Sequence, residues 1–218
     1  MAKLSRRERE KMQRRNDIIN AAEKKFFEKG FDEVSMDEIA RELELSKPTL
    51  YLYFKNKESL FFAVVLRGMV ILRDTLKSAV EKENVGLDKI LSLSHAIFDY
   101  MQKYMNYYRL NVVARGERFW NSLGNQQIEG SESYVKYVVE LFDLVKDSVQ
   151  LGIQDGSLRK GLDPLETTIF LSSTIETTAL VAPYNQILLS QSGLTLDVYQ
   201  QHSIDVLLRG IARKKKKE

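Results

Sequence analysis

The fold of this chain is indicated first by Ser46–Leu60, SKPTLYLYFKNKESL, which has the pattern of a short helix with two different faces. Ser46 can cap the N-terminus and Pro48 suits the first turn, because the first amides of a helix have no intrahelical partner. Leu50 and Phe54 lie four residues apart, so one face is apolar and can dock on a core. The other face keeps hydroxyls, phenols and ammonium groups. This arrangement suits a groove of DNA.

A second short helix is predicted just before this one. Its apolar positions recur at the spacing of one helix face: Met36, Ile39, Ala40 and Leu43. Ser35 precedes the run and Glu38 follows three residues later, which is the pattern of a capping box. Two short helices joined by a tight turn make a helix-turn-helix, whose second helix reads the major groove.

The run from Phe26 to Leu60 resembles the DNA-binding domain of the TetR/AcrR family of transcriptional regulators. The matching residues are Phe27, Gly30, Phe31, Ser35, Ile39, Ala40, Leu45, Ser46, Thr49, Leu50, Tyr51, Tyr53, Phe54, Asn56, Lys57, Glu58 and Leu60. Glu44 departs from the pattern, because the family's turn usually has glycine there. A positive φ at a glutamate costs about 1 kcal/mol, so we expect a slightly different turn.

The whole chain is predicted to be all-α in two domains. Residues 1–55 would form an N-terminal arm and the helix-turn-helix domain, and residues 56–218 a larger helical domain for effector binding and dimerisation. After a basic arm that is frayed or helical, the expected helices span residues 14–29, 36–43, 46–54, 57–82, 87–104, 107–121, 131–154, 164–182 and 195–212.

The last two predicted helices are rich in small side chains, which allow helices to approach closely. Two of them from each subunit would make a four-helix homodimer interface, as the family resemblance also implies. The alternative is that they complete the core of one subunit. A two-fold dimer would read the two half-sites of a palindromic double-stranded operator, about 34–36 Å apart.

Composition argues against several classes of protein. The chain has no cysteine and only two histidines, so we expect no disulfide, metal site or cofactor, and no enzyme. The basic N-terminus leads into no apolar segment, and no apolar run approaches membrane-spanning length. We therefore expect a soluble, cytoplasmic protein.

The net charge of +3 is unevenly distributed. Residues 1–15 and residues 209–218 each carry a net charge of +5, which leaves −7 for the rest. Basic ends on an acidic body indicate contact with a polyanion at particular places. For the C-terminal lysines, solubility alone is the simpler interpretation. The N-terminal arm adjoins the predicted DNA-binding helices and could lie along phosphates or enter a minor groove.

The DNA contacts are predicted by residue type. Lys47, Thr49 and Tyr51 are candidates for base edges and Pro48 for a thymine methyl. Phosphate contacts, which fix the register of the protein on DNA, are expected from Ser35, Tyr53, Lys55 and Lys57, and Ser46 joins the set as the cap of this helix. The full set is Ser35, Ser46, Lys47, Pro48, Thr49, Tyr51, Tyr53, Lys55 and Lys57. The alternatives are core packing for Tyr51 and ordinary surface charge for Lys57.

The larger domain has candidates for an apolar effector pocket between helices. Aromatic and flexible residues would line it, with a few polar groups: His95, Phe98, Met101, Met105, Tyr108, Asn111, Phe119, Trp120, Tyr134, Tyr137, Glu176 and Thr177. The alternatives are that the aromatic row is plain core and that His95 is a satisfied core histidine. By resemblance the effector would be apolar or amphipathic.

These observations predict a homodimeric repressor released from its operator by a small hydrophobic effector. The effector would favour a wrong separation of the two recognition helices, and the helix after residue 56 would carry the shift. A helix-turn-helix protein whose helical domain only dimerises, and an activator, remain as alternatives.

Overall fold

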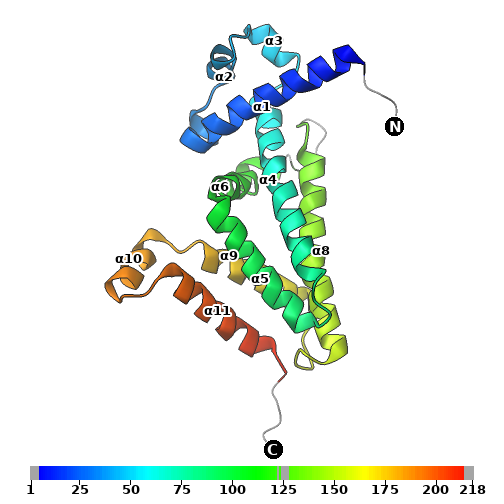
Figure 1. Ribbon diagram of the computed structural model, residues 1–218, viewed down its shortest axis with the longest axis vertical. Helices are drawn as coiled ribbons and strands as arrows, with labels where there is room; N and C mark the ends of the chain where they lie inside the picture. The colour runs from blue at the N-terminus through cyan, green and yellow to red at the C-terminus, as the bar shows by residue number, and fades with distance from the viewer. Residues whose placement is uncertain (1–4, 122, 124–127, 214–218) are drawn as a thin grey trace, which may run out of the picture. The chain divides into compact units, whose positions relative to one another are not determined.

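The computed structural model describes residues 5–121, 123 and 128–213 of the 218. Within these ranges the regular structure is helical (Figure 1), and one isolated β-bridge joins Leu158 to Ala212. The predicted all-α class is therefore confirmed. The helices are α1 (Arg6–Glu33), α2 (Met36–Glu42), α3 (Lys47–Tyr51), α4 (Lys57–Val80), α5 (Gly86–Lys103), α6 (Met105–Ala114), α7 (Glu117–Trp120), α8 (Ser131–Asp155), α9 (Pro164–Ala179), α10 (Pro183–Gln191) and α11 (Leu196–Ile211).

The chain forms two compact units. The first comprises residues 1–71 and 104–137, and the second residues 72–103 and 138–218. Helices α4 and α8 each contribute to both units. The boundary expected after residue 55 separates a DNA-binding domain from an effector domain by function, whereas these two units are separated by their internal contacts. The functional boundary therefore stays a prediction.

The first unit is organised around an aromatic cluster that joins α1, α4 and α7. Phe61 stacks on Phe119 with ring centroids 5.5 Å apart and an interplanar angle of 13°. Phe26 and Phe31 meet the same ring of Phe61 at 5.5 and 4.8 Å, and all four side chains are at most 2% exposed. Aromatic pairs at these separations stabilise a core beyond the area they bury. The small helix-turn-helix therefore shares its core with α4.

The N-terminal arm is helical from its start. Ser5 and Glu8 form a reciprocal capping box, so α1 begins at Arg6, well before residue 14. The predicted stop at Gly30 is confirmed as a break, because this residue has φ 79° and ψ 178°. A last short turn then continues to Glu33. Of the two forms expected for the arm, the structure has the helical one from Arg6 onward.

Two helix predictions were wrong in detail. The single helix expected over residues 107–121 is divided into α6 and α7, because Gly116 adopts an extended conformation with ψ 163°. Helix α10 was not predicted at all. It begins with Pro183 at its first position, where a missing N–H costs nothing, and it ends before Gly193 with φ 68°.

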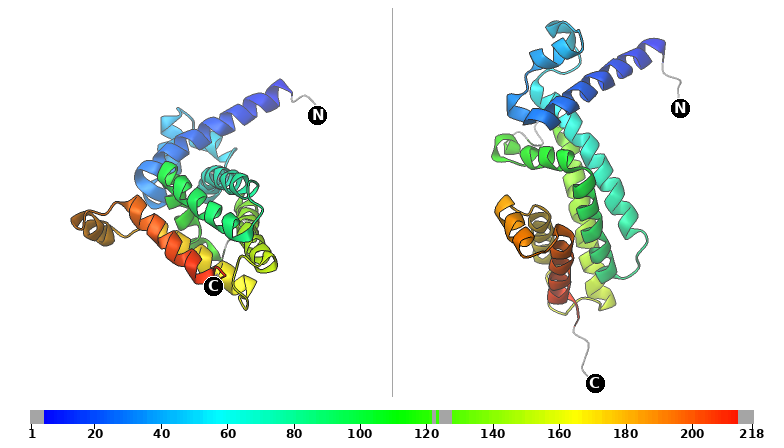
Figure 2. Two further views of the ribbon diagram at one scale, coloured as in Figure 1. Left: turned by 60° about the horizontal axis from the view of Figure 1, so that its bottom comes forward. Right: turned by 60° about the vertical axis from the view of Figure 1, so that its left-hand side comes forward.

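The second unit packs α5, α9 and α11 against one another, and α10 contacts α11 (Figure 2). The start of α5 lies unusually close to α8. A Cβ atom at Gly86 would lie 2.0 Å from the backbone nitrogen of Gly152, so no larger residue fits without a backbone shift. Asp155 accepts hydrogen bonds from the amides of Gly86 and Ser157 at 2.7 and 2.8 Å. Its carboxylate thereby caps α5.

None of the helices in the described ranges is both long and apolar enough to cross a membrane.

Candidate nucleic-acid interface and adjoining cleft

The predicted helix-turn-helix is present as α2 and α3, which pack against each other (Figure 1). Ser35 caps α2 by accepting from the Glu38 amide at 3.2 Å, and Ser46 caps α3 by accepting from the Thr49 amide at 3.3 Å. The capping box predicted for α2 is only half realised. The Glu38 carboxylate accepts from Lys29 Nζ at 2.6 Å instead. This ion pair fastens α2 to α1.

The turn between the two helices accommodates a glutamate at the position of the expected glycine. Glu44 has φ 53°, and within the described ranges it is the one non-glycine residue with positive φ. The Leu45 amide donates to the Ala40 carbonyl at 2.9 Å and closes the turn. Glu44 therefore takes the left-handed conformation itself, at a cost of about 1 kcal/mol, and the turn needs no other shape.

The recognition helix α3 separates its two faces as the sequence predicts. Leu50 and Phe54 are 0% exposed. The candidates on the other face are exposed or half-buried: Ser46, Lys47, Pro48, Thr49, Tyr51, Tyr53 and Lys55. Tyr51 is 40% exposed, which argues against the alternative that it is a core residue. Ser35, at the start of α2, is also exposed.

Lys47 is paired with an acidic residue that the sequence analysis missed. Its Nζ lies 2.8 Å from Asp37 Oδ1, and both side chains are more than half exposed. The hydrogen bond to Asp37, with the charge of that carboxylate, raises the pKa of Lys47. Asp37 therefore places a negative charge beside the residue expected to read a base. The signal was a second acidic residue in the first turn of α2, whose partner lies ten positions later.

Leu52 is a second residue that the sequence analysis missed. It is 80% exposed at the C-terminal end of α3. An apolar side chain at this place can contact a thymine methyl. The pattern gave no signal, because a leucine between two tyrosines is equally typical of a core position.

Lys57 has partners other than the phosphate expected from the sequence. Its Nζ donates to the carbonyl oxygens of Phe31 and Val34, both at 2.9 Å, and lies 4.3 Å from the centroid of the Phe31 ring. These contacts tie the start of α4 to the end of α1. They argue against a phosphate contact for Lys57. They also argue against the alternative that Lys57 is an ordinary surface charge, because its ammonium has partners within the protein.

The effector candidates are divided between the two units. The first unit contains Met105, Tyr108, Asn111, Phe119, Tyr134 and Tyr137, and the second contains His95, Phe98, Met101, Glu176 and Thr177. The side chain of Trp120 lies outside the described part of the structure.

Several of these candidates have partners within the protein. Tyr134 donates its hydroxyl to Asn111 Oδ1 at 2.7 Å, in a buried position, and Phe119 belongs to the aromatic cluster. His95 is exposed beside Gln201 rather than buried in a core. Their role as ligand contacts stays a prediction.

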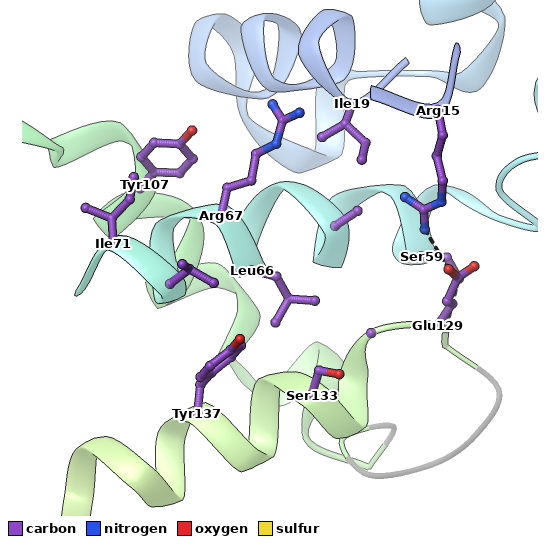
Figure 3. A pocket seen from close by; sticks show the side chains of 13 residues that line it. Arg15, Ile19, Ser59, Leu66, Arg67, Ile71, Tyr107, Glu129, Ser133 and Tyr137 are labelled. Carbon is purple, nitrogen blue, oxygen red and sulfur yellow. Dashed lines mark hydrogen bonds and ion pairs between the residues drawn. The ribbon is translucent and has the colours of Figure 1, made fainter. Parts of the chain in front are cut away.

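A cleft of about 720 Å³ lies within the first unit, among α1, α4, α6 and the start of α8 (Figure 3). Of the predicted effector residues it includes Tyr137. Its apolar surface comes mainly from α4, and Arg15 and Arg67 reach toward it from α1 and α4 (Figure 3). The lining residues are Arg15, Ile19, Ser59, Ala63, Leu66, Arg67, Val70, Ile71, Tyr107, Glu129, Gly130, Ser133 and Tyr137.

The capped pair α2–α3, with a polar outer face above a buried apolar one, has the geometry of a helix-turn-helix, the motif that places its second helix in the major groove of DNA. Comparison with known proteins agrees. Residues 18–64 match the sequence model described as "Bacterial regulatory proteins, tetR family". This match covers the later part of α1, all of α2 and α3, and the first turns of α4.

Two relatives are regulators of opposite sign. The chain is 31% identical to the HTH-type transcriptional activator FasR of Mycolicibacterium smegmatis over 98 residues. These residues make up 45% of this chain and 45% of FasR. It is 26% identical over 130 residues to the negative transcriptional regulator IcaR of the biofilm operon icaADBC in Staphylococcus aureus, covering 59% of this chain and 69% of IcaR. The chain thus spans less than half the length of the first relative.

The fold extends beyond the matched segment. The transcriptional regulator FadR of Bacillus subtilis, solved in complex with stearoyl-CoA, superposes with a TM-score of 0.65 at 21% identity, over 89% of this chain and 98% of that one. At this identity the likeness shows the fold alone. By sequence, residues 18–64 of this chain are therefore a segment of the tetR family of bacterial regulatory proteins. Over most of the rest of the chain, the comparisons show the fold of solved regulators such as FadR.

Proposed function

We propose that this protein is a homodimeric repressor that binds a palindromic operator and is released from it by a small hydrophobic effector. The observation that carries the DNA-binding part is the exposed polar face of α3, set on Leu50 and Phe54, which are 0% exposed. Such a helix is held rigidly by the core and offers its remaining side chains to a groove. Because its ligand is chromosomal DNA, we place the protein in the cytoplasm.

The contacts are proposed by exposure and chemistry. Lys47, Thr49 and Tyr51 would read base edges, and Pro48 and Leu52 would contact thymine methyls. Phosphate contacts are assigned to the exposed or half-buried polar residues around them, Ser35, Tyr53 and Lys55. Ser46 caps α3 and stands beside the same face. Lys57 is left out because its ammonium is used inside the protein.

A homodimer through α9 and α11 is supported by apolar side chains that one chain leaves exposed. Leu165 and Ile169 on α9 are 53% and 52% exposed, and Val198 and Val206 on α11 are 53% and 56% exposed. Exposed apolar patches mark interaction surfaces. Dimerisation would present two copies of α3 to two half-sites, as a palindromic operator requires.

Control by an effector is supported by a cavity of suitable size, since ligand sites occupy about 300–1,000 Å³. The neighbour FadR was solved with stearoyl-CoA, which supports a ligand-responsive fold without identifying a ligand for this chain. An effector that prefers the wrong spacing of the recognition helices weakens DNA binding by its preference ratio. A thousandfold release needs about 4 kcal/mol of differential binding.

The test is selection of an operator from random duplex DNA, repeated with a panel of hydrophobic compounds. We expect a palindromic site, one dimer bound per site in sedimentation, and loss of the complex with at least one compound. A selected site that lacks two-fold symmetry, or a monomer on DNA, would contradict the proposal. Because the relative FasR is an activator, a reporter gene behind the selected operator decides between repression and activation.

A further inference from the structure

The cleft in the first unit has an apolar floor that follows one stripe of α4. Ala63, Leu66, Val70 and Ile71 recur at the spacing of a single helix face, and all four line the cleft. Figure 3 labels Leu66 and Ile71 of this stripe. Ile19 of α1 and the ring of Tyr137 of α8 face this stripe. A ligand with an extended apolar body would bury that body here and keep it from water.

One end of the cleft is suited to an anion. Arg15 lies with its guanidinium carbon 4.2 Å from the centroid of the Phe54 ring, which fixes its position. Its Nη2 donates to Glu129 Oε1 at 2.6 Å. The start of α8, including Ser133, lies at the same end (Figure 3), and the N-terminus of a long helix favours negative charge. The carboxylate of Glu129 already occupies this environment.

Glu129 is an exchangeable partner for Arg15. Its side chain is 57% exposed, whereas that of Arg15 is 33% exposed. A guanidinium has five N–H donors and accepts a carboxylate in a bidentate manner, and the one contact with Glu129 runs through Nη2 alone. An exposed ion pair of this kind contributes little. A second carboxylate can therefore join or replace Glu129.

The opposite end of the cleft is closed by bonds within the protein. Arg67 Nη1 donates to Asn20 and Glu23 at 2.8 and 3.0 Å, and the Tyr107 hydroxyl donates to the same carboxylate oxygen of Glu23 at 2.7 Å. In this network the charge of Arg67 is paired with the carboxylate of Glu23, which accepts hydrogen bonds from both Arg67 and Tyr107. An anionic head group at this end would meet the Glu23 charge, so the anion belongs at the Arg15 end.

We propose that this cleft binds an amphipathic organic anion, with its acid group on Arg15 and its apolar body along the α4 stripe. Arg15 also braces Phe54, the buried end of the recognition helix segment. A ligand bound to Arg15 therefore contacts a residue that packs on Phe54, beneath the exposed face of α3. If the proposed regulatory function holds, this ligand is an effector that acts inside the unit carrying α3, and DNA and ligand alter each other's affinity by the same factor.

The experiment is isothermal titration of the full-length protein, without DNA, with decanoate below its micelle-forming concentration. Matched probes are 1-decanol, which lacks the charge, and decyltrimethylammonium, which reverses it. We expect decanoate to bind at least tenfold more tightly than either probe. Equal binding of all three, or no binding of decanoate at millimolar concentration, would overturn the proposal.

Variants locate the site. Arg15→Gln should weaken decanoate binding at least tenfold, because a hydrogen bond to a charged group is removed, and the exposed neighbour Arg14→Gln should leave it unchanged. Glu129→Gln should strengthen binding severalfold, since it removes the competing carboxylate. Val70→Trp should abolish binding by filling the floor, with the circular dichroism spectrum unchanged. Equal effects of the two arginine variants, or weaker binding by Glu129→Gln, would refute the assignment.

This inference and the proposed function can fail separately. Decanoate binding that follows the predicted pattern, with no operator found by selection, would keep the site and reject the regulatory role. A palindromic operator bound by a protein that ignores decanoate would do the reverse. If decanoate binds as expected, adding it to the operator complex measures the coupling between the two sites.

Discussion

Replacing Lys57 with methionine tests whether its ammonium holds the first unit together or contacts DNA. Methionine keeps the apolar stem, so the substitution removes mainly the charge and its hydrogen bonds. Nζ lies 2.9 Å from each of the Phe31 and Val34 carbonyl oxygens and above the Phe31 ring. Both carbonyls would be deprived of a charged donor at the junction of α1 with α4.

The expected cost follows from these contacts. A hydrogen bond to a charged group contributes about 1.5–3 kcal/mol, and the half-buried position places the sum at about 2 kcal/mol. For a chain of this size, each kcal/mol lowers the melting temperature by about 2–4 °C, so Lys57→Met should melt about 4–8 °C lower. Differential scanning calorimetry measures the shift directly.

The matched control is Lys55→Met, two positions earlier and exposed. It should leave the melting temperature unchanged and reduce the slope of log K against log salt by about 0.9 for each phosphate that the lysine neutralises in the wild type. Lys57→Met, measured well below its melting temperature, should keep the wild-type slope. If Lys57→Met melts like the wild type and reduces the slope instead, its ammonium contacts a phosphate and the structural role is refuted.

Three further substitutions probe other parts of the chain. Gly86→Ala should destabilise the protein strongly or prevent folding, because the new Cβ would lie 2.0 Å from the Gly152 nitrogen. Chemical denaturation measures the loss of stability. A variant as stable as the wild type would show that α5 and α8 can move apart at no cost. Burial alone would raise the pKa of Asp155, but hydrogen bonds, including that from the Gly86 amide, outweigh it and lower the pKa. Its contribution to stability is thus present above about pH 4 and lost as pH falls through the lowered pKa, and Asp155→Asn should flatten this acid dependence of the melting temperature; an unchanged pH profile would contradict it. Asp37→Asn should strengthen binding to all duplex DNA severalfold at low salt, because a charge that repels phosphates and holds Lys47 is removed; filter binding at two salt concentrations checks this, and weaker binding would show that Asp37 itself contacts a base.

The local patterns of the sequence were sufficient for the helix-turn-helix. The caps at Ser35 and Ser46 and the buried pair Leu50 and Phe54 depend on residues within a few positions of one another, so spacing alone predicts them. The same holds for the break at Gly30, where a positive φ is needed. Boundaries failed where no local pattern decides them, as in the division of residues 107–121 at Gly116.

The partners of polar side chains were decided by the tertiary structure. Lys57 faces carbonyl groups more than twenty positions earlier, and the cleft brings Arg15 of α1 to Glu129 at a separation of 114 positions. Spacing along a chain carries no information about such pairs, because they form only when distant helices pack. The sequence by itself therefore determined an all-α protein with a capped helix-turn-helix. The packing of the helices decided which charged side chains can contact a ligand. A lysine or arginine that is paired inside the protein and one that is exposed look the same in the sequence.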